Sequence, residues 1–116
     1  MDKKTIWWMF GVTKGGIQRA HIAKSLKEMP SNANRLAETL NLDYKTVRYH
    51  LDMLVKNKFA VRRGTPIAMY FLSDEFEKNY DEFLKIYEQI EERQRITYKT
   101  VPNKMVLSNK IKSHKL

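Results

Sequence analysis

Hydrophobic residues recur at helical spacing over residues 44–57. When each residue is turned by about 100°, the apolar positions fall on one side: Val47, Leu51 and Leu54. Lys45 and Tyr49 fall on the opposite side, and Asp43 stands where an N-cap residue belongs. The pattern predicts an amphipathic helix with one buried face and one polar face that carries positive charge.

A shorter helical pattern precedes it at residues 31–40. The apolar positions of this pattern share one face: Ala33, Leu36, Ala37 and Leu40. Only Asn41, Leu42 and Asp43 separate the two predicted helices. Two helices joined by so tight a turn form a helix-turn-helix, the geometry that places a second helix in the major groove of DNA.

Two short strands are predicted after the second helix, at residues 59–63 and 68–72. Turn-forming residues separate them: Gly64, Thr65 and Pro66. The hairpin contains no Asp or Glu, and Arg62 and Arg63 are adjacent in it. A hairpin directly after a helix-turn-helix is a wing, and this wing is basic.

The N-terminal part combines an aromatic run with a glycine-rich stretch. Residues 6–10 read Ile-Trp-Trp-Met-Phe, a run too short to distinguish a strand from a helix. We expect Trp7 and Trp8 to pack in the core or against a second subunit rather than to form a ligand box. The glycines of residues 11–16 predict a flexible joint.

Helical spacing returns over residues 17–29, and Pro30 stops the pattern. The apolar positions of this helix are Ile22, Ala23, Leu26 and Met29. Its polar side chains are expected on the surface: Gln18, Arg19, His21, Lys24 and Lys27. It would be the first scaffold helix of the winged fold.

The C-terminal part begins with acidic residues, which favour a helix start at Asp74. Apolar residues then recur at alternating steps of four and three: Phe76, Tyr80, Phe83, Tyr87 and Ile90. Such a stripe predicts a helix over residues 74–92 that either caps its own domain or faces a second copy, and we favour a dimerisation helix. Residues 96–116 have no clear period and predict a solvated tail, a basic arm for DNA, or both.

These elements predict a fold that is mainly α with a small β-hairpin. In this α+β arrangement a winged helix-turn-helix precedes a long C-terminal dimerisation helix. Four segments are expected: an aromatic segment with its joint (1–16), the winged helix-turn-helix (17–72), the dimerisation helix (73–95) and the basic tail (96–116).

A resemblance to a known family is carried by residues 32–37, residues 42–51, Leu54 and residues 59–61. These stretches resemble the small archaeal winged helix-turn-helix transcriptional regulators of the ArsR-like type. The resemblance implies double-stranded DNA as the partner and a homodimer as the acting species. It also implies the basal transcription machinery as a further partner.

Charge is segregated along the chain, whose formal net charge is +9. Residues 1–72 hold 13 Lys and Arg against 5 Asp and Glu, whereas residues 73–98 hold 4 against 8. Residues 99–116 hold 5 Lys and no acidic residue. The excess of positive charge in the winged part and the tail favours a polyanionic partner.

Several classes of function are disfavoured by composition. The chain has no cysteine, which excludes disulfides and thiolate metal sites. The three histidines lie on separate segments without a supporting Ser or Asp arrangement, so we expect no enzyme, no metal and no cofactor. No run approaches the ~20 apolar residues of a membrane span, and the short N-terminal run lacks a signal peptide's length and cleavage site. A cytoplasmic protein without a membrane partner is therefore expected.

The candidate DNA contacts fall into three groups. Base readout is assigned to Lys45, Thr46, Arg48 and Tyr49. Phosphate contacts are assigned to Ser31, Asn32, Asn34, Arg35, Tyr44 and Lys56. Wing contacts to the backbone or the minor groove are assigned to Arg62, Arg63 and Thr65.

The dimer interface is assigned to Trp7, Trp8, Phe76, Tyr80, Phe83, Tyr87 and Ile90. For His50, at the margin of the recognition helix, a locally satisfied hydrogen bond is favoured over DNA contact or pH sensing.

Two alternative functions remain open at this stage. One is an effector-gated regulator with a ligand between the aromatic N-terminus and the helix over residues 74–92. The other is a winged helix that docks an acidic protein. The residues do not determine whether such a regulator activates or represses.

Overall fold

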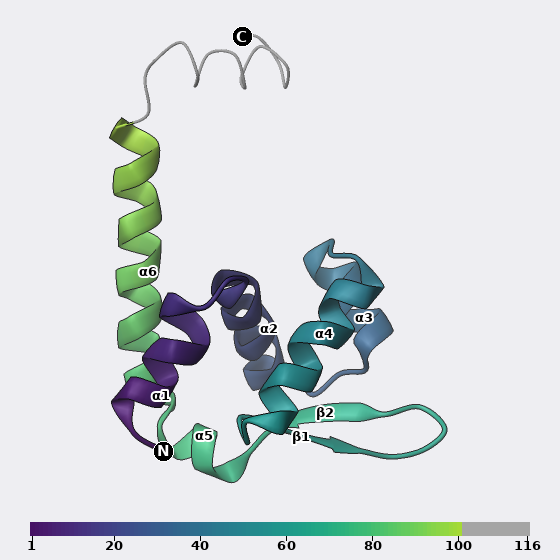
Figure 1. The fold of residues 1–116 in the computed structure, drawn as a ribbon. Coiled ribbons are helices and arrows are strands. Elements are labelled where there is room, and N and C mark those ends of the chain that lie inside the picture. The colour runs from purple at the N-terminus through teal and green to yellow at the C-terminus, as the bar shows by residue number, and fades with distance from the viewer. Residues whose placement is uncertain (101–116) are drawn as a thin grey trace, which may run out of the picture.

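The centre of the molecule is a three-helix unit followed by a hairpin, seen in a computed structural model that describes residues 1–100 (Figure 1). Its elements are α2 (Gly16–Glu28), α3 (Ala33–Leu40), α4 (Tyr44–Lys56), β1 (Ala60–Arg63) and β2 (Met69–Leu72). The two strands are antiparallel, with Ala60 opposite Leu72 and Arg63 opposite Met69. This order is that of a winged helix-turn-helix, and the predicted fold class is confirmed.

Local capping accounts for the tight turn between α3 and α4. The Asp43 carboxylate accepts the Thr46 backbone N–H at 3.2 Å, as the sequence predicts. At the other end of the turn, Asn41 adopts φ 54, the left-handed conformation that ends many helices. The two helices are therefore held at a defined angle by three intervening residues.

The helix predicted from residue 31 begins two residues later, at Ala33. Asn32 is its N-cap, and the Asn32 side chain accepts the Arg35 backbone N–H at 2.8 Å. Ser31 instead pairs with Tyr70 in β2, since the Tyr70 N–H donates to the Ser31 carbonyl at 2.8 Å. Ser31 thus extends the hairpin sheet rather than the helix.

The N-terminal segment is helical and closely packed. It consists of α1 (Lys3–Trp7) and a π-helical turn, η1 (Trp8–Val12). A Cβ on Gly16 would lie 2.4 Å from the Phe10 carbonyl oxygen, and one on Gly11 would overlap the Trp7 ring. The sequence indicated a flexible joint here; in the structure these two glycines permit close approach of neighbouring groups.

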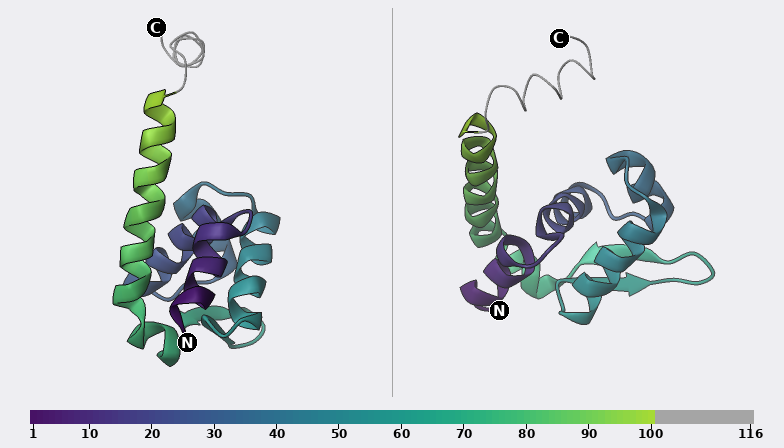
Figure 2. Two further views of the ribbon diagram at one scale, coloured as in Figure 1. Left: turned by 60° about the vertical axis from the view of Figure 1, so that its left-hand side comes forward. Right: turned by 45° about the horizontal axis from the view of Figure 1, so that its top comes forward.

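The single helix predicted over residues 74–92 is divided into α5 (Asp74–Lys78) and α6 (Tyr80–Thr100). The first helix begins at Asp74 as expected, and Ser73 is its N-cap: the Ser73 hydroxyl accepts the Phe76 backbone N–H at 3.1 Å. The break falls at Asn79, beyond which α6 runs along α1 and extends past the rest of the fold (Figures 1 and 2). Residues 101–116 of the predicted tail lie outside the described residues.

The core is dominated by aromatic rings from segments distant in sequence. The Phe10 ring of η1 lies 4.7 Å from that of Phe83 and 5.4 Å from that of Phe59, measured between centroids. Phe76 joins the same cluster, 5.4 Å from Phe83. The N-terminal segment and α6 therefore share one core with the winged unit.

This packing overturns most of the predicted dimer interface. Four residues of the predicted seam are buried by the chain itself: Phe76, Phe83, Tyr87 and Ile90. They close their own domain, the alternative that the heptad-like spacing left open. Tyr80 and Trp7 are half-buried, and Trp8 is 43% exposed.

No helix within residues 1–100 is both long enough and apolar enough to cross a membrane.

Candidate nucleic-acid interface

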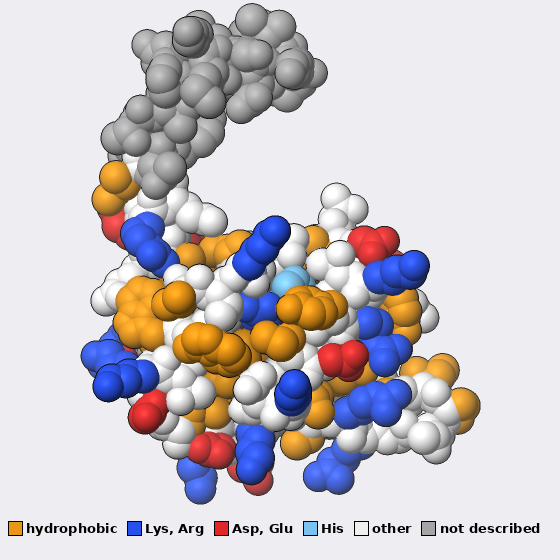
Figure 3. Space-filling model, in the orientation of Figure 1, with side chains coloured by type: hydrophobic (Ala, Val, Ile, Leu, Met, Phe, Trp, Pro, Cys, Tyr) orange, Lys and Arg blue, Asp and Glu red, His pale blue; other side chains and the backbone are white. Residues whose placement is uncertain are grey.

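The outward face of α4 bears the side chains expected for base readout. Lys45 is exposed and Tyr49 is 57% exposed, while Thr46 is half-buried between them. These three residues line a shallow hollow with Lys14, Gly15 and Gln18. Figure 3 shows Lys and Arg side chains over α4 and the base of the hairpin, whereas hydrophobic side chains gather over α1 and η1.

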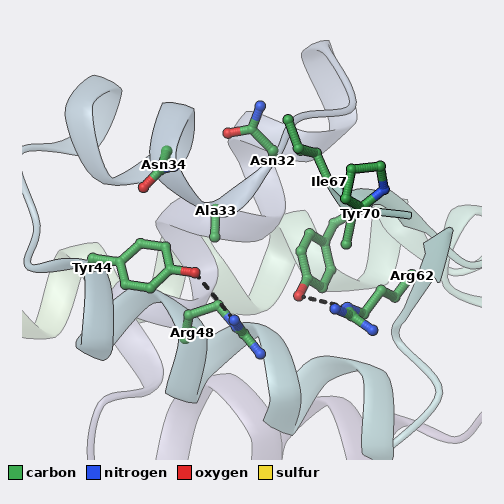
Figure 4. Close-up of a pocket in the computed structure, with 10 residues that line it drawn as sticks. Asn32, Ala33, Asn34, Tyr44, Arg48, Arg62, Ile67 and Tyr70 are labelled. Atoms are coloured by element: carbon green, nitrogen blue, oxygen red, sulfur yellow. Dashed lines mark hydrogen bonds between the residues drawn. The ribbon is translucent and has the colours of Figure 1, made fainter. Parts of the chain in front are cut away.

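Arg48 departs from this group, because its side chain extends toward the hairpin. Its Nη1 donates to the Tyr44 hydroxyl at 3.1 Å, and its Nε is buried without a hydrogen-bond partner among the described residues. Arg48 therefore lines a hollow between α4 and the wing (Figure 4). The four residues predicted to read bases are thus divided between two surfaces.

We call this hollow the wing pocket; its volume is about 310 Å³. It is lined by Asn32, Ala33, Asn34, Tyr44, Arg48, Arg62, Pro66, Ile67, Ala68 and Tyr70. The start of α3, the first turns of α4 and the hairpin supply these residues. Three elements that are separate in sequence therefore form one basic concavity.

The residues predicted to contact phosphates are not equally accessible. Asn34, Arg35 and Lys56 are exposed, and Tyr44 is 43% exposed. Ser31 is only 5% exposed, and its hydroxyl donates to the Met29 carbonyl at 3.3 Å. Ser31 is therefore not placed to hold a phosphate, because its side chain is committed to the interior.

The wing residues are exposed as expected. Arg62, Arg63 and Thr65 all lie on the surface of the hairpin and its turn. Arg62 is partly anchored, since its Nε donates to the hydroxyl of Tyr70 at 3.2 Å. Gly64 has φ +96, a conformation that side-chain-bearing residues rarely adopt.

Arg19 was expected on the surface of its helix, but it is fully buried. Its Nε donates to the Met9 carbonyl at 3.1 Å, and its Nη2 donates to the Lys14 carbonyl at 3.1 Å and to the Thr13 hydroxyl. Burial lowers the pKa of this guanidinium from its usual value. The helical spacing could have predicted that residue 19 is buried, because it lies one turn before Ile22 and Ala23 on the apolar face.

His50 is buried beside Arg19 and is satisfied by hydrogen bonds, but its partners come from α2 rather than from its own helix. Arg19 Nη1 donates to His50 Nδ1 at 3.2 Å. Nδ1 must then be the acceptor, so Nε2 carries the proton and donates to Gln18 Oε1 at 2.9 Å. Burial first, and the neighbouring Arg19 charge second, lower the pKa of His50 to about 4.

The fold should therefore lose stability in acid through His50. The folded protein holds this imidazole neutral while the unfolded chain protonates it near pH 6.5. The contribution of His50 to the free energy of unfolding is therefore fully present above about pH 6.5. It is lost as the pH falls toward 4, by roughly 3 kcal/mol in total. Urea unfolding of the wild type and of His50→Gln between pH 7 and 4 measures the difference. His21→Gln, at an exposed histidine, is the control and should follow the wild type, and a parallel decline in H50Q would refute the assignment.

The ligand site considered between the aromatic N-terminus and residues 74–92 is occupied by packed side chains. Phe10 stacks on Phe76 with centroids 5.7 Å apart and meets Phe83 edge-on. This region is core, because its aromatic rings pack against one another. The packing does not favour the effector-gated alternative at this place.

The sequence matches no protein-family model and no curated protein. Among solved structures, a MarR transcriptional regulator from Methanosarcina mazei Go1 is similar over 95% of this chain and 80% of its own, with a TM-score of 0.62 and 16% identity. The YusO protein of Bacillus subtilis is similar over 95% and 77%, with a TM-score of 0.59 and 18% identity. Wild-type ZitR of Lactococcus lactis in complex with DNA is similar over 90% and 76%, with a TM-score of 0.55 and 15% identity.

At these identities the likeness concerns the fold alone. It agrees with the element order described above, which is that of a winged helix-turn-helix protein. The finer resemblance to archaeal ArsR-like regulators is not tested by these structures and stays a prediction.

Proposed function

We propose that this protein is a transcriptional regulator that binds specific sequences of double-stranded DNA. The observation that carries the proposal is the outward face of α4, where Lys45 and Tyr49 are exposed. A hairpin follows α4 directly, and its Arg62 and Arg63 are exposed as well. In a winged helix-turn-helix this helix is the one that enters the major groove. The solved structure of ZitR with DNA shows that a protein with a similar fold binds this partner.

The proposed roles follow from side-chain chemistry. Lys45 is suited to donate to the O6 and N7 atoms of guanine, and Thr46 to meet a thymine methyl group or a base-edge acceptor. Tyr49 adds a ring and a hydroxyl at the same face. Arg35 on α3 and Lys56 at the end of α4, both exposed, would neutralise phosphates and so set the register of the helix on the duplex.

We further propose that the acting species is a homodimer of the ArsR-like type in the cytoplasm. Of the predicted interface, the buried residues Phe76, Phe83, Tyr87 and Ile90 are not available for self-association, whereas the two tryptophans keep exposed surface. Trp8 and Val12 of η1 are 43% and 71% exposed, and Trp7 is half-buried beside them. Two copies related by a two-fold axis would present α4 to half-sites about 34 Å apart. No comparison supports a contact with the basal transcription machinery.

Selection of bound duplexes from a random pool, followed by footprinting, tests this function. The selected sites should contain two related half-sites. Lys45→Ala and Tyr49→Ala should each weaken binding to the selected site by about 1–3 kcal/mol and relax the preference at a few base pairs. Fluorescence anisotropy measures both effects.

Lys85→Ala is the matched control, because Lys85 is an exposed lysine on α6, away from the proposed interface. It should bind as the wild type does. A pool in which no duplex is enriched over competitor would refute the proposed function. Stable binding of an acidic protein by the Lys45→Ala, Tyr49→Ala double variant would favour a docking module instead.

A further inference from the structure

The wing pocket has the chemistry of an anion site. Two guanidinium groups, from Arg48 and Arg62, and two phenol hydroxyls, from Tyr44 and Tyr70, face the same hollow (Figure 4). None of the ten residues that line it is acidic. Two cations share this space without a lining carboxylate to neutralise them.

One donor in this pocket has no partner. The Nε of Arg48 is buried and makes no hydrogen bond to any described residue. A buried donor left unpaired is costly, and such groups call for an explanation. An anion in the pocket would supply the missing acceptor, because a guanidinium presents several donors in one plane to phosphate oxygens.

Both arginines are held by their neighbours before any ligand arrives. Tyr44 accepts from Arg48 Nη1 at 3.1 Å, and Tyr70 accepts from Arg62 Nε at 3.2 Å. Tyr70 is itself fixed, since it is 1% exposed and pairs with Ser31 through the backbone. Pre-set donors lose little conformational freedom on binding, which favours recognition of one small group.

The start of α3 adds a further favourable contribution. Ala33 and Asn34 line the pocket and are the first two residues of this eight-residue helix. The first backbone N–H groups of a helix have no partner within it, and the helix dipole attracts negative charge there. The Asn32 cap engages the N–H of Arg35 and no other backbone donor of this first turn.

Size and position indicate which anion fits. The volume of about 310 Å³ is at the lower end of the range for small-molecule sites. Ile67, which is 67% exposed, and Pro66 form an apolar rim on the hairpin side, suited to the sugar carbons beside a phosphate. The pocket lies between the helix proposed for the major groove and the wing, where a strand of the DNA backbone would pass.

We propose that the wing pocket binds one phosphodiester group of the DNA backbone, with Arg48 and Arg62 both donating to its non-bridging oxygens. Arg48 then sets the position of α4 and reads no base, unlike Lys45 and Tyr49. This inference rests on the proposed function. Free inorganic phosphate offers the same oxygens, and the experiment distinguishes the two sources.

The test is a scan in which each phosphate of a selected duplex is replaced in turn by a neutral methylphosphonate. Binding is measured for the wild type, Arg48→Gln and Arg62→Gln, after thermal unfolding has shown that the variants fold. At one phosphate in each half-site the neutral group should weaken wild-type binding about 10-fold. For Arg48→Gln and Arg62→Gln, the duplex with the neutral group at that same phosphate should bind almost as well as the unmodified duplex, because the contact is already lost in these variants.

Two further readings separate backbone contact from base readout. Each variant should lower the magnitude of the slope of log K against log salt by about 0.9, the value for one phosphate contact. The base preference of R48Q, found by repeating the selection, should match that of the wild type. Relaxed preference at one base pair, or the absence of a phosphate whose effect depends on both arginines, would overturn the proposal.

Arg63→Gln is the matched control, because Arg63 is exposed in the same strand but does not line the wing pocket. It should retain the full 10-fold sensitivity at the critical phosphate. If the sensitivity disappears in R63Q as well, the pocket is not the site of contact and the proposal fails.

The second arm titrates inorganic phosphate into the free protein and into the protein–duplex complex, and follows the arginine Nε–H groups by NMR. The proposal expects no saturable shift at Arg48 or Arg62 in the complex, because a phosphate of the duplex already occupies the wing pocket. Equal saturable shifts in the complex and in the free protein would assign the pocket to free phosphate and overturn the DNA source. If no duplex binds at all, the proposed function fails by itself. In that case, an NMR response of the wild type to inorganic phosphate that is lost in R48Q and R62Q supports the anion pocket. A wild type without any response to phosphate overturns the anion pocket.

Discussion

Phe83→Ala is expected to lower the free energy of unfolding by about 3–5 kcal/mol. The Phe83 side chain is completely buried and contacts the rings of Phe10, Phe76 and Tyr80. Truncation removes the transfer energy of the ring and leaves a cavity that its aromatic neighbours fill only in part. Equilibrium unfolding in urea, followed by circular dichroism, measures the change.

The same variant tests which surface the α6 stripe covers. Because Phe83 lies in the core of its own chain, the loss of stability should not depend on protein concentration. Ile96→Ala, at a residue of the same helix that is 51% exposed, is the control and should change stability by less than about 0.5 kcal/mol. A fully stable Phe83→Ala protein that had merely dissociated into folded monomers would show that the seam is an intersubunit contact after all.

Arg19→Met is expected to destabilise the fold by about 3 kcal/mol or more, since it leaves several buried acceptors without donors. The acceptors are the carbonyls of Met9 and Lys14, the hydroxyl of Thr13 and His50 Nδ1. Arg19 thereby ties η1 and the following loop to α4, so that its loss affects three segments together. Thermal and urea unfolding measure the change.

Arg19→Lys separates charge from geometry. One ammonium group does not reach acceptors that a planar guanidinium contacts on several sides, so R19K should also be destabilised. Lys27→Met is the control on the same helix, because Lys27 is an exposed residue in a surface ion pair with Glu77. It should cost less than about 1 kcal/mol. If R19M unfolded at the wild-type urea concentration, the network would contribute little to stability.

The helix-turn-helix was predictable because its signals are local. Asp43 caps α4 within one turn. The spacing of Val47 and Leu51 identifies the buried face of this helix, and the exposure of Lys45 on the opposite face follows from it. The hairpin was predictable for the same reason, since its strands lie next to each other along the chain. A contact between near neighbours leaves its mark in a short stretch of sequence.

The path of the N-terminal segment was not predictable from composition. Gly11 and Gly16 resemble a flexible joint in the sequence, yet a Cβ on Gly16 would lie against the Phe10 backbone and one on Gly11 would overlap the Trp7 ring. The same residue type serves both for chain flexibility and for tight packing, so the sequence alone does not tell the two roles apart. Only the distance from Gly16 to the Phe10 carbonyl distinguishes them.

The sequence by itself determined which faces are apolar, where the helices of the central motif begin, and where positive charge is concentrated. Only the tertiary structure decided what covers each apolar face, as the burial of Phe83 beneath η1 demonstrates. It also decided the direction of the long basic side chains, since Arg19 turns into the core and Arg48 turns toward the wing. The physical reason is that periodicity defines a surface but not its partner, and a flexible arginine reaches in either direction from the same backbone position.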